Sequence, residues 1–299
     1  MIEVTQDIFL ELETRGIECV ILHHFDFEEG GDIDFCASEG NLEAFLGGLR
    51  AVLSGEGWQI LQVFEHELSA AYIVCADMTE GGRFLLLDYC YDYRIRGHCI
   101  LKNEEMLSSA QTLPWGGMGC EGSVELAYRF AKGAAKGKDS EKITEDLKEL
   151  YIGHEEKFAG WLSERWSLEL GSWTERKVGS TLGHLAECLQ KQSWSLDEVT
   201  LKARRLKRPR GLWLECPDEL VGKIDKELGL CFRKVRRAQT PGASLKSVMG
   251  STLVIERTGR TPSWKRRGLQ IMNCWLQASS VEDVIQFLGE RNARYSKWK

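Results

Sequence analysis

The stretch Gly30-Gly31-Asp32-Ile33-Asp34 constrains this chain most, because it places two carboxylates one residue apart behind a glycine pair. Side chains at positions i and i+2 of a strand leave the same face, so Asp32 and Asp34 would lie within about 7 Å of each other. Carboxylates this close repel each other unless a cation lies between them, and Mg²⁺ prefers oxygen ligands of this kind. A solvated Gly-Asp turn is the alternative interpretation of the same residues.

A third carboxylate follows a later apolar run. Residues 84–87 read Phe-Leu-Leu-Leu and are followed directly by Asp88. An unpaired charge at the end of a buried strand is costly, and its presence would be explained if Asp88 were a third metal ligand on a neighbouring strand. The alternative is that Asp88 only begins the polar loop after the strand. Asp32, Asp34 and Asp88 are therefore the candidate metal ligands and catalytic residues.

These three acids give the chain a resemblance to the nucleotidyltransferase superfamily of the DNA polymerase β type, over about residues 15–100. The resemblance implies that Asp32, Asp34 and Asp88 together hold two Mg²⁺ ions. It also implies that an NTP such as ATP binds there and that an NMP passes to an acceptor by in-line displacement. The acceptor could be a small molecule, a protein or RNA.

The sequence departs from the family pattern just before the acid pair. The family places a Gly-Gly or Gly-Ser pair at a helix start, where it binds the triphosphate, whereas the strand expected over 18–25 runs here into His23 and His24. The phosphate-binding glycines are therefore either Gly30 and Gly31 or absent. A non-catalytic nucleotide-binding or scaffold protein is accordingly an alternative function.

Three basic residues are further candidates for nucleotide binding. Arg94 and Arg96 follow closely on Asp88 and could reach a phosphate, or they could simply cover the neighbouring tyrosines with their aliphatic stems. Lys132 lies on a helix predicted over 123–138, and related proteins place lysines of such a helix beside the nucleotide. The alternative is that this lysine only offsets the helix dipole.

Charge is distributed very unevenly along the chain. Residues 1–201 contain 17 Lys and Arg against 36 Asp and Glu, a net charge of −19, whereas residues 202–299 contain 22 against 9, a net charge of +13. The basic segment could dock on the acidic one, or it could hold a phosphate-bearing partner. An RNA-binding protein that uses this segment is the third candidate function, although few aromatic residues alternate with the basic ones.

Composition sets the expected environment. None of the ten cysteines forms a C-x-x-C pair, which argues against a zinc ribbon. No run of 18 apolar residues and no basic, apolar leader is present, so we expect a cytoplasmic protein with reduced thiols and no membrane span.

The order of elements predicts an α+β protein: a nucleotidyltransferase-like mixed sheet with helices, a helical subdomain and a small α/β domain. The expected domains are a catalytic domain over 1–120, a helical subdomain over 121–201, a basic linker over 202–210 and a basic α/β domain over 211–299. In the last, we expect a helix over 218–228, strands near 230–236, 251–257 and 268–276, and a final helix over 280–293.

The last domain resembles, in its position, the thymidylate-kinase-like P-loop domain that follows some front halves of this type. Only Gly222-Lys223 keeps a trace of the phosphate-binding motif, and Ile224 stands where the motif has a hydroxyl. Without the glycine-rich loop, backbone N–H groups cannot surround a phosphate. We therefore expect a degenerate P-loop-like domain without kinase activity.

Overall fold

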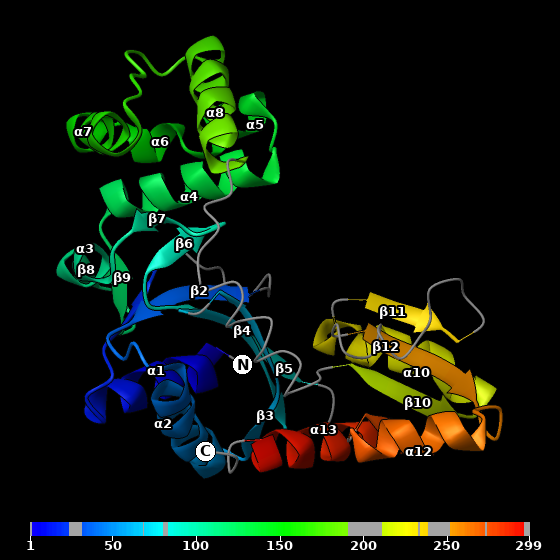
Figure 1. Ribbon diagram of the computed structural model, residues 1–299. Coiled ribbons are helices and arrows are strands. Elements are labelled where there is room, and N and C mark those ends of the chain that lie inside the picture. The colour runs from blue at the N-terminus through cyan, green and yellow to red at the C-terminus, as the bar shows by residue number, and fades with distance from the viewer. Residues whose placement is uncertain are drawn as a thin grey trace. The chain divides into compact units, whose positions relative to one another are not determined.

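The computed structural model shows a mixed α/β protein (Figure 1). It describes residues 2–23, 32–67, 69–79, 83–190, 211–232, 234–238, 252–272 and 274–295. The chain divides into two compact units: Met1–Gly48 with Asp88–Ser195, and Leu49–Leu87 with Leu196–Lys299. Within the described ranges, no helix is both long and apolar enough to cross a membrane.

The two units do not follow chain order, because residues 49–87 cluster with the C-terminal part. The boundaries expected at 120, 201 and 210 follow the chain, and they stay a prediction. The expected basic linker over 202–210 lies outside the described residues.

The first unit contains strands in the order β5-β2-β1-β9-β8. Their bounds are β1 Cys19–Ile21, β2 Asp32–Ala37, β5 Phe84–Cys90, β8 Ala110–Thr112 and β9 Met118–Cys120, and the last residues of β5, from Asp88, belong to this unit. Strand β2 runs antiparallel to β1, with Ile21 opposite Phe35, and β9 runs parallel to β1. This order places β2, with its two aspartates, directly beside the strand that carries Asp88.

Helices complete the first unit. Their bounds are α1 Ile2–Thr14, α2 Leu42–Gly55 (in this unit up to residue 48), α3 Asn103–Ser108, α4 Gly122–Lys136, α5 Ser140–Asp146, α6 Lys148–Tyr151, α7 Glu155–Trp166 and α8 Glu175–Gln190. A two-stranded ribbon, β6 (Tyr93–Ile95) and β7 (His98–Leu101), precedes α3. Helix α4 lies centrally, in contact with β7, α6, α7 and α8 (Figure 1).

Aromatic packing holds the helices of this unit together. Phe158 of α7 is fully buried, and its ring meets Phe130 of α4 edge-on at 5.3 Å. Trp173 stacks on Tyr151 at 4.4 Å between ring centroids and donates its indole N–H to the Thr144 carbonyl. Helix α4 is thus anchored from the side opposite the sheet, which fixes the side chains that it presents toward β2.

The second unit combines an antiparallel hairpin with a parallel sheet. The hairpin strands are β3 (Trp58–Glu67) and β4 (Ala70–Asp77), and the order there is β3-β4-β5. The parallel sheet has the order β11-β12-β10-β13, with bounds β10 Leu212–Cys216, β11 Lys234–Arg237, β12 Thr252–Arg257 and β13 Trp275–Gln277. Helices α10 (Asp218–Leu228), α12 (Ser263–Ile271) and α13 (Val281–Tyr295) and the short 3-10 turn η1 (Gly229–Cys231) complete it.

The strand expected near 268–276 is wrong for most of its length. Helix α12 covers 263–271, and only residues 275–277 form a strand. Tertiary contacts explain the difference: Lys265 lies 3.5 Å above the ring of the buried Trp213, and Arg266 pairs at 3.2 Å with Glu215, which is fully buried in β10. A short apolar run is compatible with either element, so these long-range contacts decide.

Candidate metal centre

Three carboxylates converge from two neighbouring strands of the first unit. Asp32 and Asp34 come from β2 and Asp88 from β5, and one ligand oxygen of each lies within 4.8 Å of the others. Asp34 is buried, with 3% of its surface exposed, whereas the other two remain accessible to solvent. The alternation of a strand explains the pair, because residues two apart leave the same face.

Two basic side chains meet the buried carboxylate. The Lys132 ammonium donates to Oδ2 of Asp34 at 2.6 Å, and Nε2 of His23 lies 2.9 Å from the same oxygen. His23 follows β1, the neighbour of β2, and Lys132 comes from α4, 98 residues further along the chain than Asp34. The site is therefore assembled from β2, its two neighbours β1 and β5, and helix α4.

The electrostatics of Asp34 reflect these partners. Burial by itself would raise the pKa of this carboxyl, but the hydrogen bond with His23 and the positive charge of Lys132 outweigh burial and hold the pKa well below its ordinary value of 3.8. Asp34 is consequently a carboxylate throughout the neutral range, as a metal ligand has to be.

Tyr128 extends the same network along α4. Its hydroxyl accepts a hydrogen bond from Lys132 at 2.7 Å, one helical turn away, and the Tyr93 ring packs against it at 4.5 Å between centroids. Burial raises the pKa of Tyr128 strongly, and the negative charge of Asp34 adds to the effect. The phenol is therefore neutral, and it orients the lysine toward Asp34.

The donor set fits a hard divalent cation. The three aspartates contribute a charge of −3 and Lys132 contributes +1, which leaves −2 at the site when His23 is neutral. The converging ligand atoms are carboxylate oxygens, which suit Mg²⁺ better than they suit the softer transition metals. The three aspartates could therefore hold a metal ion, and its identity as Mg²⁺ stays a prediction.

The other predicted nucleotide-binding residues lie as follows. Gly30 and Gly31 are outside the described residues. Arg94, on β6, pairs with Asp92 at 2.9 Å, and Arg96 occupies the β6–β7 turn with φ of 51°, next to Gly97 at 85°. Neither observation links these arginines to the three aspartates, so their phosphate contacts stay a prediction.

His23 and Tyr128 were not among the predicted site residues. Tyr128 and Lys132 are four apart on a predicted helix, so the sequence indicated that they share a face. No local pattern indicated that this face meets β2. The position of His23 directly after a buried strand was visible, but its approach to Asp34 depends on the antiparallel pairing of β1 and β2.

Comparison with known proteins adds no assignment: the chain matches no protein-family model, no curated protein and no solved structure. The site is accordingly interpreted from its own geometry.

Proposed function

We propose that the protein is a Mg²⁺-dependent nucleotidyltransferase that moves an NMP from an NTP to a hydroxyl or phosphate of an acceptor. The observation that carries the proposal is the convergence of Asp32, Asp34 and Asp88 within 4.8 Å, beside a lysine that contacts one of them. Paired acids on one strand and a third on its neighbour are what the resemblance to the nucleotidyltransferase superfamily implies.

In this proposal, Asp32, Asp34 and Asp88 hold the metal. Bound Mg²⁺ would supply charge stabilisation for the triphosphate and lower the pKa of a coordinated acceptor oxygen. The protein's own contribution begins at Asp34, because His23 and Lys132 keep that carboxylate ionised and in one orientation. A site organised before the substrate arrives needs little rearrangement during the reaction.

The remaining residues would act on the reacting groups. Asp88, accessible to solvent, accepts the proton of the acceptor hydroxyl as its oxygen attacks the α-phosphorus. A new oxygen–phosphorus bond forms, the bond to the β-phosphate's bridging oxygen breaks, and pyrophosphate leaves with that electron pair. Lys132 lies beside the site and would offset the negative charge of the phosphates.

The test is transfer of label from each α-labelled NTP to components of a cell extract in the presence of Mg²⁺. We expect Asp88→Asn and Asp32→Asn to lower transfer by about a hundredfold or more, because the charge stabilisation lost amounts to several kcal/mol. Asp146→Asn, a change of the same kind at an exposed position on α5, should transfer label at the wild-type rate. Binding of Mn²⁺, followed by electron paramagnetic resonance, gives a second readout that does not depend on turnover.

Two outcomes would overturn the proposal. Equal transfer by wild type and Asp88→Asn would show that the triad is not the catalytic site. If wild type binds neither Mn²⁺ nor any NTP saturably, the non-catalytic scaffold is favoured, and the carboxylates are a remnant.

A further inference from the structure

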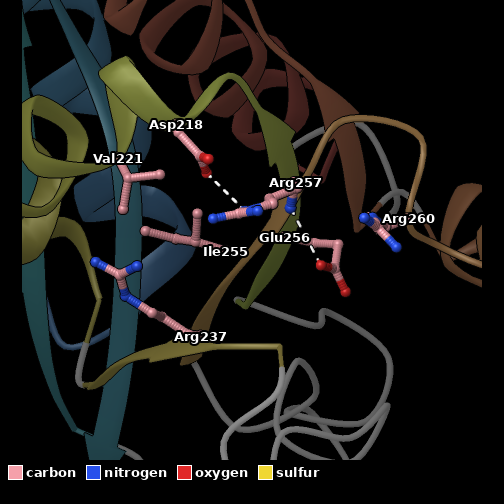
Figure 2. A pocket seen from close by; sticks show the side chains of 7 residues that line it. All are labelled: Asp218, Val221, Arg237, Ile255, Glu256, Arg257 and Arg260. Atoms are coloured by element: carbon pink, nitrogen blue, oxygen red, sulfur yellow. Dashed lines mark hydrogen bonds and ion pairs between the residues drawn. The ribbon is translucent and has the colours of Figure 1, made fainter.

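The parallel sheet of the second unit carries a pocket of about 270 Å³ that is unrelated to the aspartate triad. Its lining comes from the start of α10, the end of β11, and β12 with the turn after it, as Figure 2 shows. The lining residues are Asp218, Val221, Arg237, Ile255, Glu256, Arg257 and Arg260. Three of these seven are arginines.

The sheet's topology explains why the pocket forms here. Strands β10, β11 and β12 run parallel, so their carboxyl ends lie at one edge, with Cys216 in register with Arg257 and Arg237 in register with Ile255. Ligands of open parallel sheets bind outside this edge, where the chain turns from strand to helix. Arg237, Ile255 and Arg257 share one face of the sheet, because partners in register and residues two apart along a strand point the same way.

One of the three arginines forms an ion pair within the pocket. Arg257 pairs through Nε with Oδ1 of Asp218 at 2.9 Å, and Figure 2 shows this pair crossing the pocket from β12 to α10. Both side chains are more than half exposed, so the pair adds little stability, but it directs the guanidinium along the pocket wall. Asp218 therefore offsets the charge of Arg257.

Arg237 and Arg260 are the two that remain. Among the residues that the structure describes, no carboxylate pairs with either guanidinium, and both side chains are exposed. Glu256 is the other acid of the lining, and one of its oxygens accepts the Arg257 backbone N–H at 3.1 Å. The lining therefore has a net charge of +1, within a C-terminal segment whose net charge is +13.

The floor of the pocket is apolar. Ile255 is 4% exposed and belongs to the core between the sheet and its helices, and the half-buried Val221 lies beside it on α10. An apolar floor with guanidinium groups at the rim can bind an anionic group that carries a small organic body. The volume of about 270 Å³ suits a small ligand, because it lies just below the usual range of about 300–1,000 Å³ for drug-sized molecules.

The geometry points to a phosphate-binding site in this pocket, formed by Arg237 and Arg260 and supported by Arg257, for a small phosphate-bearing ligand. Two guanidinium groups that pair with no carboxylate of the described residues can both donate to one phosphate, and their planar forks match its oxygens. Side chains supply the donors here, in contrast to the backbone cradle of a P-loop, which this domain lacks. The inference is independent of the proposed transferase activity.

The experiment is calorimetric titration of the full chain with inorganic phosphate and with phenyl phosphate, at constant ionic strength and with EDTA present. We expect saturable binding by wild type, about tenfold weaker in Arg237→Gln or Arg260→Gln, the effect of losing one charge-assisted contact worth about 1.4 kcal/mol. The double variant should bind about a hundredfold more weakly. Tighter binding of phenyl phosphate would identify an organic phosphomonoester, and equal binding of both probes would identify free phosphate.

The matched control is Lys234→Gln with Arg267→Gln, which also removes two exposed positive charges but changes no residue of the lining. This variant should bind both probes as wild type does. The inference is overturned if wild type shows no saturable binding, if Arg237→Gln with Arg260→Gln binds as tightly as wild type, or if the control loses as much affinity. Because both pocket arginines are exposed, circular dichroism spectra of all variants should be unchanged.

Discussion

Replacing Lys132 by Met tests whether the contact with Asp34 organises the candidate metal centre. Asp34 is 4% exposed at its side chain and Lys132 is 22% exposed, so the ion pair is largely withdrawn from water. Removing one partner of a fully buried pair costs about 3–5 kcal/mol, since the other charge stays buried without compensation. His23 still contacts the same oxygen and water reaches the lysine side, so we expect the variant to lose about 2–3 kcal/mol of unfolding free energy.

The matched control is Lys136→Met, one turn further along α4. That lysine is exposed, and its replacement should cost less than about 1 kcal/mol, mainly through the lost interaction with the helix dipole. Urea denaturation followed by circular dichroism, with EDTA present, measures both variants. The double variant Asp34→Asn with Lys132→Met should be more stable than Lys132→Met alone, because the buried carboxylate that lost its lysine is then neutral.

The pH dependence gives a second readout of the same pair. The pKa of Asp34 is lowered on folding, so its contribution to stability is complete above the ordinary value of 3.8 and is lost as the pH falls below it. In Lys132→Met the depression shrinks, and the variant should show a smaller stability loss between pH 4 and pH 2 than wild type. Equal urea midpoints for Lys132→Met and Lys136→Met would refute the reasoning.

Two further changes test the scaffold around the site. Gly137 ends α4 in the left-handed conformation, with φ of 62°, and its N–H donates to carbonyls of the last turn. Gly137→Ala should therefore lower the unfolding free energy, measured by urea titration, by about 1 kcal/mol. An unchanged urea midpoint would argue against this helix end. Phe158 is fully buried beside Phe130, so Phe158→Ala should cost about 3–5 kcal/mol by the same measurement, whereas the exposed Lys157→Ala should cost far less. A loss below about 1 kcal/mol at Phe158 would mean that this aromatic cluster does not hold the helices together.

Local patterns in the sequence were sufficient for the parts of the fold that depend on neighbouring residues. The helix predicted over 123–138 is observed at 122–136, and the helix predicted over 218–228 has those bounds. Strand β2 begins at Asp32, as the alternation after the glycine pair indicated. Periodicity records which face of an element is buried, so elements with clear periodicity could be located from sequence.

The predicted element type was wrong where a short apolar run had no periodicity to support it. Residues 268–276 have the composition of a strand, but the chain continues α12 to residue 271. The contact of Lys265 with Trp213 and the pairing of Arg266 with Glu215 join residues about fifty positions apart. Local propensity does not reflect contacts between residues so far apart in the chain, and here these contacts outweigh the local propensity.

The candidate site also has features that follow from the sequence and features that follow only from the tertiary structure. The sequence by itself determined that Asp32 and Asp34 share a face and that a carboxylate follows the apolar run at 84–87, because both follow from residue order along single strands. Only the tertiary structure decided that Asp88 lies within 4.8 Å of the pair and that His23 and Lys132 meet at Asp34. The physical reason is that strand order and the packing of α4 bring together side chains far apart in the chain, such as Asp34 and Lys132, which are 98 residues apart. The local pattern of a chain specifies only which face each element buries.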